Sequence, residues 1–203
     1  MDSNCCTVCI VDDDDSVRRS LSRLAIASGW KVKAFASAFE FMDSLPSIEA
    51  ACAVLDIRLP DFTGPQLHEW MTAEGYSVPV VFLTGHGDIP TGVQAMKRGA
   101  VDFLLKPADP EVLLEAIGQA LACHAAESAR KQRQQSIRAR HARLTSRERE
   151  VMEHVIRGRL NKQIAADLGI SLKTVKVHRA RAMEKMGVHS VAVLVRLCQT
   201  AGI

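Results

Sequence analysis

Polar residues that could bind a cation and a phosphoryl group follow four apolar runs of this 203-residue chain. They are Asp12–Asp15 after Cys5–Val11, Asp56 after Ala51–Leu55, Thr84 after Val78–Leu83, and Lys106 after Val101–Leu105. Short apolar runs rich in β-branched residues are typical of buried strands. Parallel strands end at one edge of a sheet, where open α/β folds bind their ligands, so we expect these polar groups to meet there.

Each of these groups has a role that its chemistry allows. Converging carboxylates repel one another until a cation such as Mg2+ (or Mn2+), which prefers oxygen ligands, neutralises them. Asp56 stands alone at its strand end and is the candidate nucleophile. Lys106 could pair with Asp56 and later with phosphoryl oxygens, and the hydroxyl of Thr84 could follow the phosphoryl group. One such residue could merely cap a strand, so the prediction depends on all four occurring together.

The sequence around these positions predicts an α/β fold of five βα units. The expected strands are Cys5–Val11, Trp30–Phe35, Ala51–Leu55, Pro79–Leu83 and Val101–Leu105. Helical spacing of apolar residues separates them, with Ser16 as a candidate cap of the first helix and Pro110–Cys123 as the last helix. Five such units form a doubly wound parallel sheet.

The basic segment over residues 123–143 differs in composition from everything before it. It contains the run RKQRQQSIRARHAR and has little apolar periodicity. This composition favours a solvated helical linker that could continue the preceding helix. Contact between the basic run and DNA phosphates is the alternative interpretation.

Residues 144–203 are predicted to form a small all-α bundle. A capping-box-like start at Thr145 or Ser146 opens the first helix. Two later helices flank the turn Gly169–Ser171, which makes a helix-turn-helix. In the helix after the turn, the residues expected to face the core are Leu172, Val175, Met183 and Met186.

Charge is distributed unevenly along the chain, whose net charge is +3. Residues 1–122 carry −8, residues 123–143 carry +5 and residues 144–203 carry +6. An acidic first part suits a cation or phosphoryl site, whereas a basic remainder suits a polyanion such as DNA. The apolar fraction of 47% is that of an ordinary globular protein.

Six cysteines, two of them in the CxxC of Cys6 and Cys9, raise the alternative of a metal or redox site. In a strand their odd separation points them to opposite faces, and no second CxxC accompanies them, so buried apolar cysteine is favoured.

No apolar stretch nears the ~18 residues that span a membrane, and the N-terminus lacks the basic region of a signal peptide. We therefore expect a cytoplasmic protein without a membrane partner.

Residues 5–122 resemble the receiver domains of two-component response regulators, whose fold is flavodoxin- or CheY-like. The matching stretches are VDDDDSVRRSL, VLDIRLPDFTG, VFLTGHGDIP and GAVDFLLKP, and TGHGDIP is typical of the FixJ subgroup. The resemblance implies that Asp56 accepts a phosphoryl group, with Thr84 and Lys106 as switch residues and Phe103 as the switch aromatic. It also implies a cis Lys106–Pro107 bond.

The same resemblance implies the metal ligands and two tuning positions. Asp13 would bind Mg2+ directly, Asp12 mostly through water, and Asp56 and the backbone carbonyl of Arg58 would complete the protein ligands. Arg58 and His86, two residues beyond Asp56 and Thr84, would tune the lifetime of the acyl phosphate.

The last 60 residues resemble the LuxR- or NarL-type helix-turn-helix domain. The matching stretch is LTSREREVMEHVIRGRLNKQIAADLGISLKTVKVHRARAMEKMGV, in which TVKVH is highly specific. By resemblance, Lys176 and Val177 are the expected base readers, while Arg179 and Arg181 meet phosphates. The remaining candidate DNA contacts are Asn161, Lys162, Ser171, Lys173, Thr174 and Lys185.

These observations favour a phosphorylation-controlled transcription regulator that is not an enzyme. Its parts would be a receiver domain (1–122), a helical basic linker (123–143) and a helix-turn-helix domain (144–203). Expected partners are a sensor histidine kinase, an operator in double-stranded DNA, a second copy bound through residues 88–105, and RNA polymerase as a possible further partner.

Two alternatives remain. Asp12-x-Asp14 faintly resembles the opening motif of haloacid-dehalogenase-like phosphatases, but that class leaves Asp56 and the basic domain unexplained. A regulator that binds DNA regardless of phosphorylation is the other.

Overall fold

A computed structural model describes residues 6–85, 96 and 99–203 of the chain. It contains two compact units, residues 1–127 and residues 128–203. The boundary between them falls inside helix α5 (Pro110–Ala142).

The first unit is built on a parallel five-stranded sheet in the order β2-β1-β3-β4-β5. Its strands are β1 (Thr7–Val11), β2 (Lys31–Phe35), β3 (Ala50–Asp56), β4 (Val80–Thr84) and β5 (Asp102–Leu105). Its described helices are α1 (Asp15–Ala27), α2 (Ala38–Ser44) with a 3-10 turn over Leu45–Ser47, α3 (Gly64–Ala73) and the beginning of α5. The expected doubly wound α/β fold is confirmed, with strand ends shifted by one or two residues. The helix expected near residues 90–98 lies almost entirely outside the described residues.

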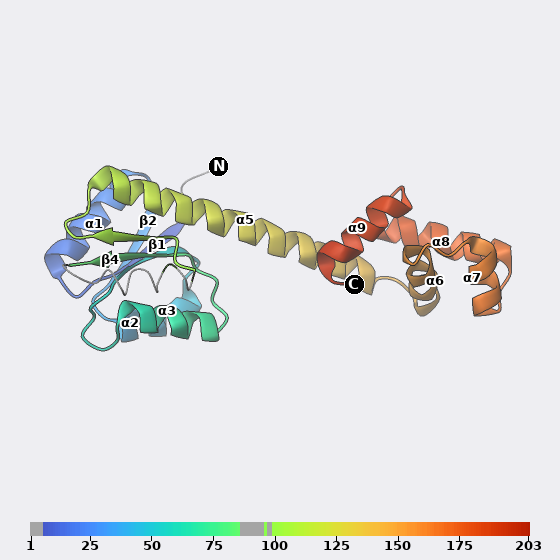
Figure 1. The fold of residues 1–203 in the computed structure, drawn as a ribbon, viewed down its shortest axis with the longest axis horizontal. Coiled ribbons are helices and arrows are strands. Elements are labelled where there is room, and N and C mark those ends of the chain that lie inside the picture. Colours follow the sequence, from blue (N-terminus) through green and yellow to red (C-terminus); the bar gives the residue numbers. More distant parts are fainter. Residues whose placement is uncertain (1–5, 86–95, 97–98) are drawn as a thin grey trace. The chain divides into compact units, whose positions relative to one another are not determined.

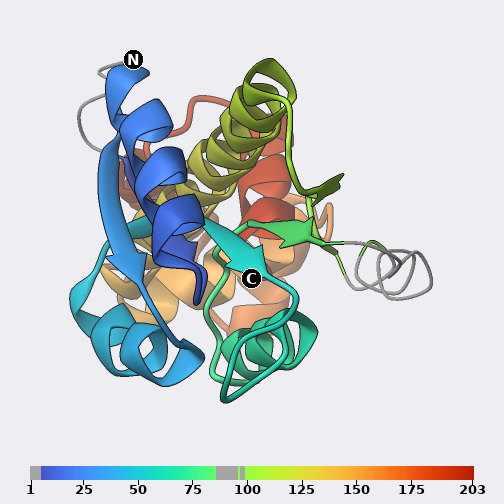
Figure 2. The ribbon, with the colours of Figure 1, turned by 90° about the vertical axis from the view of Figure 1, so that its left-hand side faces the viewer.

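Helices cover both faces of this sheet, and each face has its own apolar core (Figures 1 and 2). Helices α2 and α3 bury Phe41 and Leu67 against one face. Helices α1 and α5 cover the other face, where Ile117 of α5 packs with strand residues such as Ile10 and Val54. Figure 2 shows α1 and the start of α5 on one side of the sheet and α2 and α3 on the other. Strand β3 is buried along its whole length, which is why its sequence is a continuous apolar run.

Polar caps fix where the helices beside the strand ends begin. Asp14, not the expected Ser16, caps α1, because its carboxylate accepts hydrogen bonds from the backbone N–H groups of Ser16 (2.8 Å) and Val17 (3.2 Å). Thr63 caps α3 and forms a reciprocal capping box with Gln66. The Lys106–Pro107 peptide bond is cis, as the resemblance implied.

The second unit combines the end of α5 with α6 (Ser146–Ile156), α7 (Asn161–Leu168), α8 (Leu172–Met186) and α9 (Val191–Ala201). Gly169, with φ of 63°, adopts the left-handed conformation that ends α7 and turns the chain into α8. Thr145, with Glu148, forms the expected capping box of α6. The expected all-α helix-turn-helix domain is therefore confirmed.

Two expectations about packing in this unit were wrong. Leu172 is 39% exposed, and Ala182 occupies the buried position on α8 beside Val175 and Met186. Leu172 is the first residue of α8, where the helix has not yet turned its apolar face toward the core. The segment 123–143 is helical as expected, but it is not solvated throughout, because Ile137 is buried in the core of the second unit.

Candidate functional site

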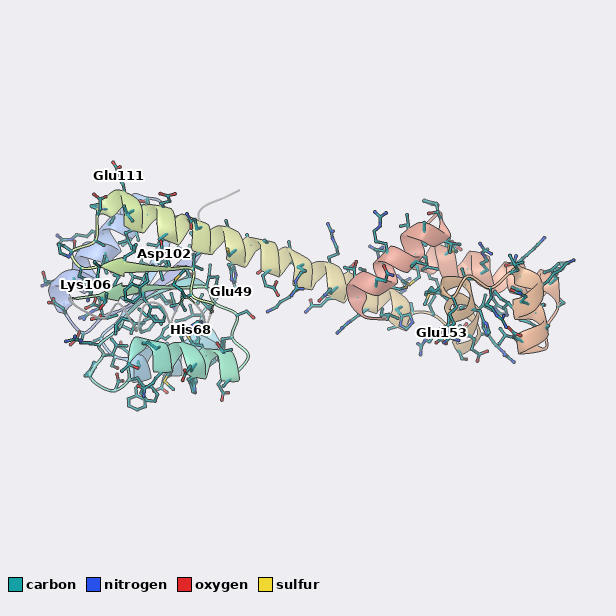
Figure 3. The ribbon with its side chains drawn as sticks, viewed as in Figure 1. Glu49, His68, Asp102, Lys106, Glu111 and Glu153 are labelled. Atoms are coloured by element: carbon teal, nitrogen blue, oxygen red, sulfur yellow. The ribbon has the colours of Figure 1, made fainter. Side chains whose placement is uncertain are left out.

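The polar residues expected at the strand ends do meet at the carboxyl edge of the sheet. Asp56 and Thr84 are the last residues of β3 and β4, while Asp12 and Lys106 directly follow β1 and β5. Figure 3 shows Lys106 at the end of the sheet opposite Glu49, which precedes β3. Strand β1 lies between β2 and β3, so the chain reverses its winding direction there and the ends of β1 and β3 are neighbours.

Lys106 joins two carboxylates at this edge. Its Nζ donates to Asp12 Oδ2 at 2.6 Å and to Asp56 Oδ2 at 2.8 Å. The side chain of Asp12 is 1% exposed, that of Asp56 10% and that of Lys106 20%. Burial by itself lowers the pKa of Lys106, but the bonds to the two carboxylates outweigh burial and raise it. The lysine therefore stays charged and holds the two acids together.

Asp13 completes a set of three carboxylates that could hold a metal ion. Asp12, Asp13 and Asp56 each present an oxygen, and these oxygens lie within 4.8 Å of one another. Asp13 is exposed while Asp12 and Asp56 are buried, so the set opens to solvent on one side. All-oxygen donors of this kind fit a hard divalent cation such as Mg2+.

Arg18 is a contributor that the sequence reasoning missed. Its Nη1 donates to the backbone oxygens of Asp12 (2.8 Å) and Asp13 (3.4 Å), and its Nη2 pairs with Asp15 at 2.8 Å. The guanidinium thus fixes the backbone on which the acidic run is displayed. An arginine in the first turns of a helix is common, so only its position beside an acidic run could have indicated this role.

Hydrogen bonds fix the loop after Asp56 both to itself and to the start of α2. Gly64 donates from its N–H to the carbonyl of Ile57 at 2.9 Å, and a Cβ at Gly64 would overlap the backbone oxygen of Asp56. The carboxylate of Asp61 accepts from the N–H groups of Ala38 (3.1 Å) and Phe39 (2.8 Å), which lie at the start of α2. This loop also carries Arg58, whose side chain is exposed.

Thr84 lies on β4, which neighbours β3, and Phe103 lies on β5 at the edge of the sheet. Thr84 is 1% exposed, and its hydroxyl donates to the carbonyl of Gly85 at 3.0 Å. Phe103 is half-buried, pairs in register with Phe82 and packs against the core beneath α2 and α3. His86 lies outside the described residues.

In the second unit, helix α8 exposes a basic surface near its N-terminus. Ser171 caps α8 by accepting from the N–H of Thr174 at 3.1 Å. Lys173, Lys176 and Val177 are exposed on the first turns, with Arg181 exposed one turn later. Lys162 is exposed at the start of α7. These candidate DNA contacts therefore lie on accessible helix surfaces.

Two other candidates are already paired within the domain. Arg179 Nη1 donates to Asn161 Oδ1 at 2.8 Å, and both residues line an open depression together with Lys176. Lys185 Nζ donates to Glu148 Oε2 at 2.6 Å and to the backbone oxygen of Arg143 at 3.3 Å. The position of Lys185 in the last turn of α8 makes it a link to α6 rather than a free cation.

The sequence is similar to two protein families. A family model described as "Response regulator receiver domain" matches residues 8–118. A second, described as "Bacterial regulatory proteins, luxR family", matches residues 142–198. The two matches coincide with the acidic edge of the sheet and with the helix-turn-helix.

Similar proteins cover both units. The transcriptional regulatory protein FixJ of Azorhizobium caulinodans is 41% identical over 194 residues, covering 96% of this chain and 92% of that protein. The solved structure of the response regulator StyR is 44% identical with a TM-score of 0.85, covering 95% of this chain and 98% of that one. Full-length FixJ from B. japonicum is 41% identical with a TM-score of 0.60, covering 97% of each chain. Within the described residues, no helix is long and apolar enough to cross a membrane.

Proposed function

This chain belongs to the two-component response regulators that join a receiver domain to a LuxR-family DNA-binding domain, and we propose that a phosphoryl group on Asp56 controls its binding to DNA. As a member of that family it is a DNA-binding transcription regulator. The receiver domain implies a sensor histidine kinase as the donor.

The observation that carries the proposal is the bridge made by Lys106 between Asp12 and Asp56. A structural lysine at a strand end would need one partner, whereas this one holds two buried acids at the reversal point of the sheet. A phosphoryl group on Asp56 would accept the hydrogen bond that Lys106 donates to Asp56 Oδ2 in the present structure. Through Lys106, the change at Asp56 would then reach the neighbouring strand ends.

The chemistry follows from the residues at this edge. A carboxylate oxygen of Asp56 attacks the phosphorus of a phosphohistidine, the P–N bond breaks, and its electron pair returns to the imidazole of the kinase. Mg2+ (or Mn2+) held by Asp12, Asp13, Asp56 and the backbone carbonyl of Arg58 would neutralise the charges that keep the phosphoryl oxygens away from the acids. Lys106 and the hydroxyl of Thr84 contact those oxygens afterwards, and Phe103 moves inward behind Thr84. The phosphoryl group ends on the chain itself, so we do not expect turnover of an external substrate.

For DNA recognition we propose that the N-terminal half of α8 enters the major groove. Lys176 and Val177 read base edges there, while Lys162, Ser171, Lys173, Thr174 and Arg181 contact phosphates. Arg179, which is hydrogen-bonded to Asn161, makes one further phosphate contact. Lys185 contributes only if it leaves Glu148.

Phosphorylation would act by pairing two copies through residues 88–105. Among the described residues, Met96 and Leu105 are 45% and 58% exposed, which suits an apolar contact between receivers. Residues 88–95 and 97–98 of that surface lie outside the described residues. A dimer of receivers raises the local concentration of two DNA-binding domains, which then bind paired half-sites. In this scheme residues 1–122 act as the receiver domain and residues 144–203 carry the helix-turn-helix, joined by the helical segment 123–143.

The deciding experiment is solution mass by light scattering, with and without Mg2+ plus beryllofluoride, for the wild type and Asp56→Asn. Beryllofluoride stands in for a phosphoryl group on a carboxylate. We expect a monomer that becomes a dimer only in the wild type. A dimer that forms equally in Asp56→Asn would contradict a switch at Asp56, and an unchanged mass in both would contradict control by dimerisation in the absence of DNA.

A further inference from the structure

The basic run at the end of α5 is attached to the helices of the DNA-binding domain. Ile137 is 2% exposed and belongs to the core formed by α6, α8 and α9. Its burial turns one face of α5 toward these helices. Gln134 lies three residues before Ile137 and four before Arg138, and residues three or four apart share a side of a helix. Arg140 lies one turn further on.

These side chains donate to the last carbonyl groups of two helices. Gln134 Nε2 donates to the backbone oxygen of Thr200 at 3.0 Å, and Arg138 Nε donates to that of Ala201 at 3.2 Å. Both carbonyls end α9. Arg140 Nη1 donates to the backbone oxygen of Met186 at 3.2 Å, which is the last residue of α8. The final carbonyls of a helix have no partner within it and carry partial negative charge, so cations there are stabilising.

The end of α8 is shaped to receive Arg140. Gly187 follows α8 with φ of 67°, a left-handed conformation that favours glycine. A Cβ at Gly187 would lie 3.2 Å from Arg140 Nη1, so the guanidinium packs directly over the glycine. In return, Lys185 in the last turn of α8 donates to the backbone oxygen of Arg143 just beyond α5. The two helix ends are thus tied in both directions.

We propose that Gln134, Ile137, Arg138 and Arg140 form a brace that positions the recognition helix α8 and its neighbour α9, and that the basic run is not an arm for DNA phosphates. The functional DNA-binding domain then begins upstream of residue 134. The brace holds the C-terminal end of α8 while its N-terminal half remains free for DNA. Arg140 and Arg138 are positioning residues that act through α8 and α9.

The test compares alanine variants at three arginines of the same helix in the full-length chain. Arg140→Ala and Arg138→Ala each remove one brace contact. Arg133→Ala is the matched control, since Arg133 is exposed and has no side-chain partner within the described part of the chain. Each variant loses one positive charge and gains the best helix former, so the stability of α5 itself is not reduced. The DNA probe is a duplex selected from a random-sequence library by the wild-type chain.

Two readouts separate a brace from a DNA arm. Amide exchange should become roughly tenfold faster near Met186 in Arg140→Ala and near Ala201 in Arg138→Ala, and stay unchanged in Arg133→Ala, a tenfold change being about 1.4 kcal/mol. Affinity for the selected duplex should fall several-fold in Arg140→Ala with the salt dependence unchanged. Loss of a direct phosphate contact would instead reduce the slope of log K against log salt by ~0.9. Arg140→Lys, which can still donate to the carbonyl, should largely restore both readouts.

Two outcomes would overturn the proposal. Equal affinity losses in the Arg133 and Arg140 variants, each with a reduced salt slope, would make the run a DNA arm. Wild-type exchange rates and wild-type affinity in Arg140→Ala would mean that the contact with Met186 positions nothing.

Discussion

Single residues at the carboxyl edge of the sheet are constrained by what surrounds them as much as by their chemistry. Gly64 begins α3 directly against the backbone of Asp56, so its missing side chain is what allows the helix and the strand end to approach. Asp56 can be recognised in the sequence by its type and its position at a strand end. Gly64 cannot, because glycine at the start of a helix after Thr63 has several ordinary explanations.

Gly64→Ala should destabilise the first unit by about 1–3 kcal/mol, the usual cost of forcing atoms into a filled site. It should also slow phosphorylation of Asp56, because the new Cβ displaces the backbone that carries the carboxylate. Urea unfolding followed by tryptophan fluorescence measures the first effect, since both tryptophans, Trp30 and Trp70, lie in this unit.

Gly118→Ala is the matched control for that variant. Gly118 lies inside α5, and a Cβ there meets nothing within 4 Å. Removing a glycine from a helix interior should stabilise by about 0.5–1 kcal/mol. If Gly64→Ala were as stable as Gly118→Ala, the close approach to Asp56 would not constrain the fold.

At the scale of helices and strands, the sequence predicted the elements whose apolar residues follow the pattern of a buried strand or an amphipathic helix. The five strands and the carboxyl-edge site followed from apolar runs and from the topology that parallel strands impose. The cap of α1 was assigned wrongly, because four acids precede Ser16 and any of them could accept the first N–H groups; the geometry selects Asp14. The packing of the end of α5 inside the second unit was missed because Ile137 is the one large apolar residue in a polar run, and side-chain contacts to helix ends leave no periodic pattern.

The link between α6 and α8 is an ion pair with a clear dependence on pH. The hydrogen bond from Lys185, together with that from the N–H of Thr145, lowers the pKa of Glu148 from an ordinary 4.5 to about 2. A folded-state pKa below the unfolded one means that the stabilisation is complete above about pH 4.5 and is lost as pH falls toward 2. Glu148→Gln should therefore cost about 1.5–3 kcal/mol at neutral pH and little at pH 2, the range being that of hydrogen bonds to charged groups.

Amide exchange across α6 and α8 is the suitable measurement, because every Trp, Tyr and Phe lies in residues 1–127 and the second unit has no aromatic reporter. Glutamine keeps the capping box with Thr145, so the substitution isolates the charge. Glu150→Gln is the control, since its pair with Arg147 is about half exposed on both sides and should be worth under ~1 kcal/mol. Equal effects of the two substitutions at neutral pH would show that burial of the Glu148–Lys185 pair adds nothing.

Across the whole molecule, the two units carry opposite charge. Residues 1–127 have a net charge of −9 and residues 128–203 of +12. DNA attracts the second unit and repels the first, and both effects act over a Debye length of about 10 Å at 0.1 M salt. We therefore expect the negative charge of the receiver to oppose DNA binding in the unphosphorylated chain.

The fragment 128–203, which has its own apolar core, should bind random-sequence duplex about tenfold more tightly than the full chain at low salt. The two affinities should converge near 0.5 M salt, where the field of the receiver is screened. A full-length variant with Asp43, Glu49 and Glu74 changed to glutamine or asparagine separates charge from obstruction, because these acids are exposed and lie away from the phosphoryl site. It should fall between the wild type and the fragment. A fragment that binds more tightly by the same factor at every salt concentration, with the charge variant indistinguishable from the wild type, would show that the receiver obstructs the DNA surface sterically instead.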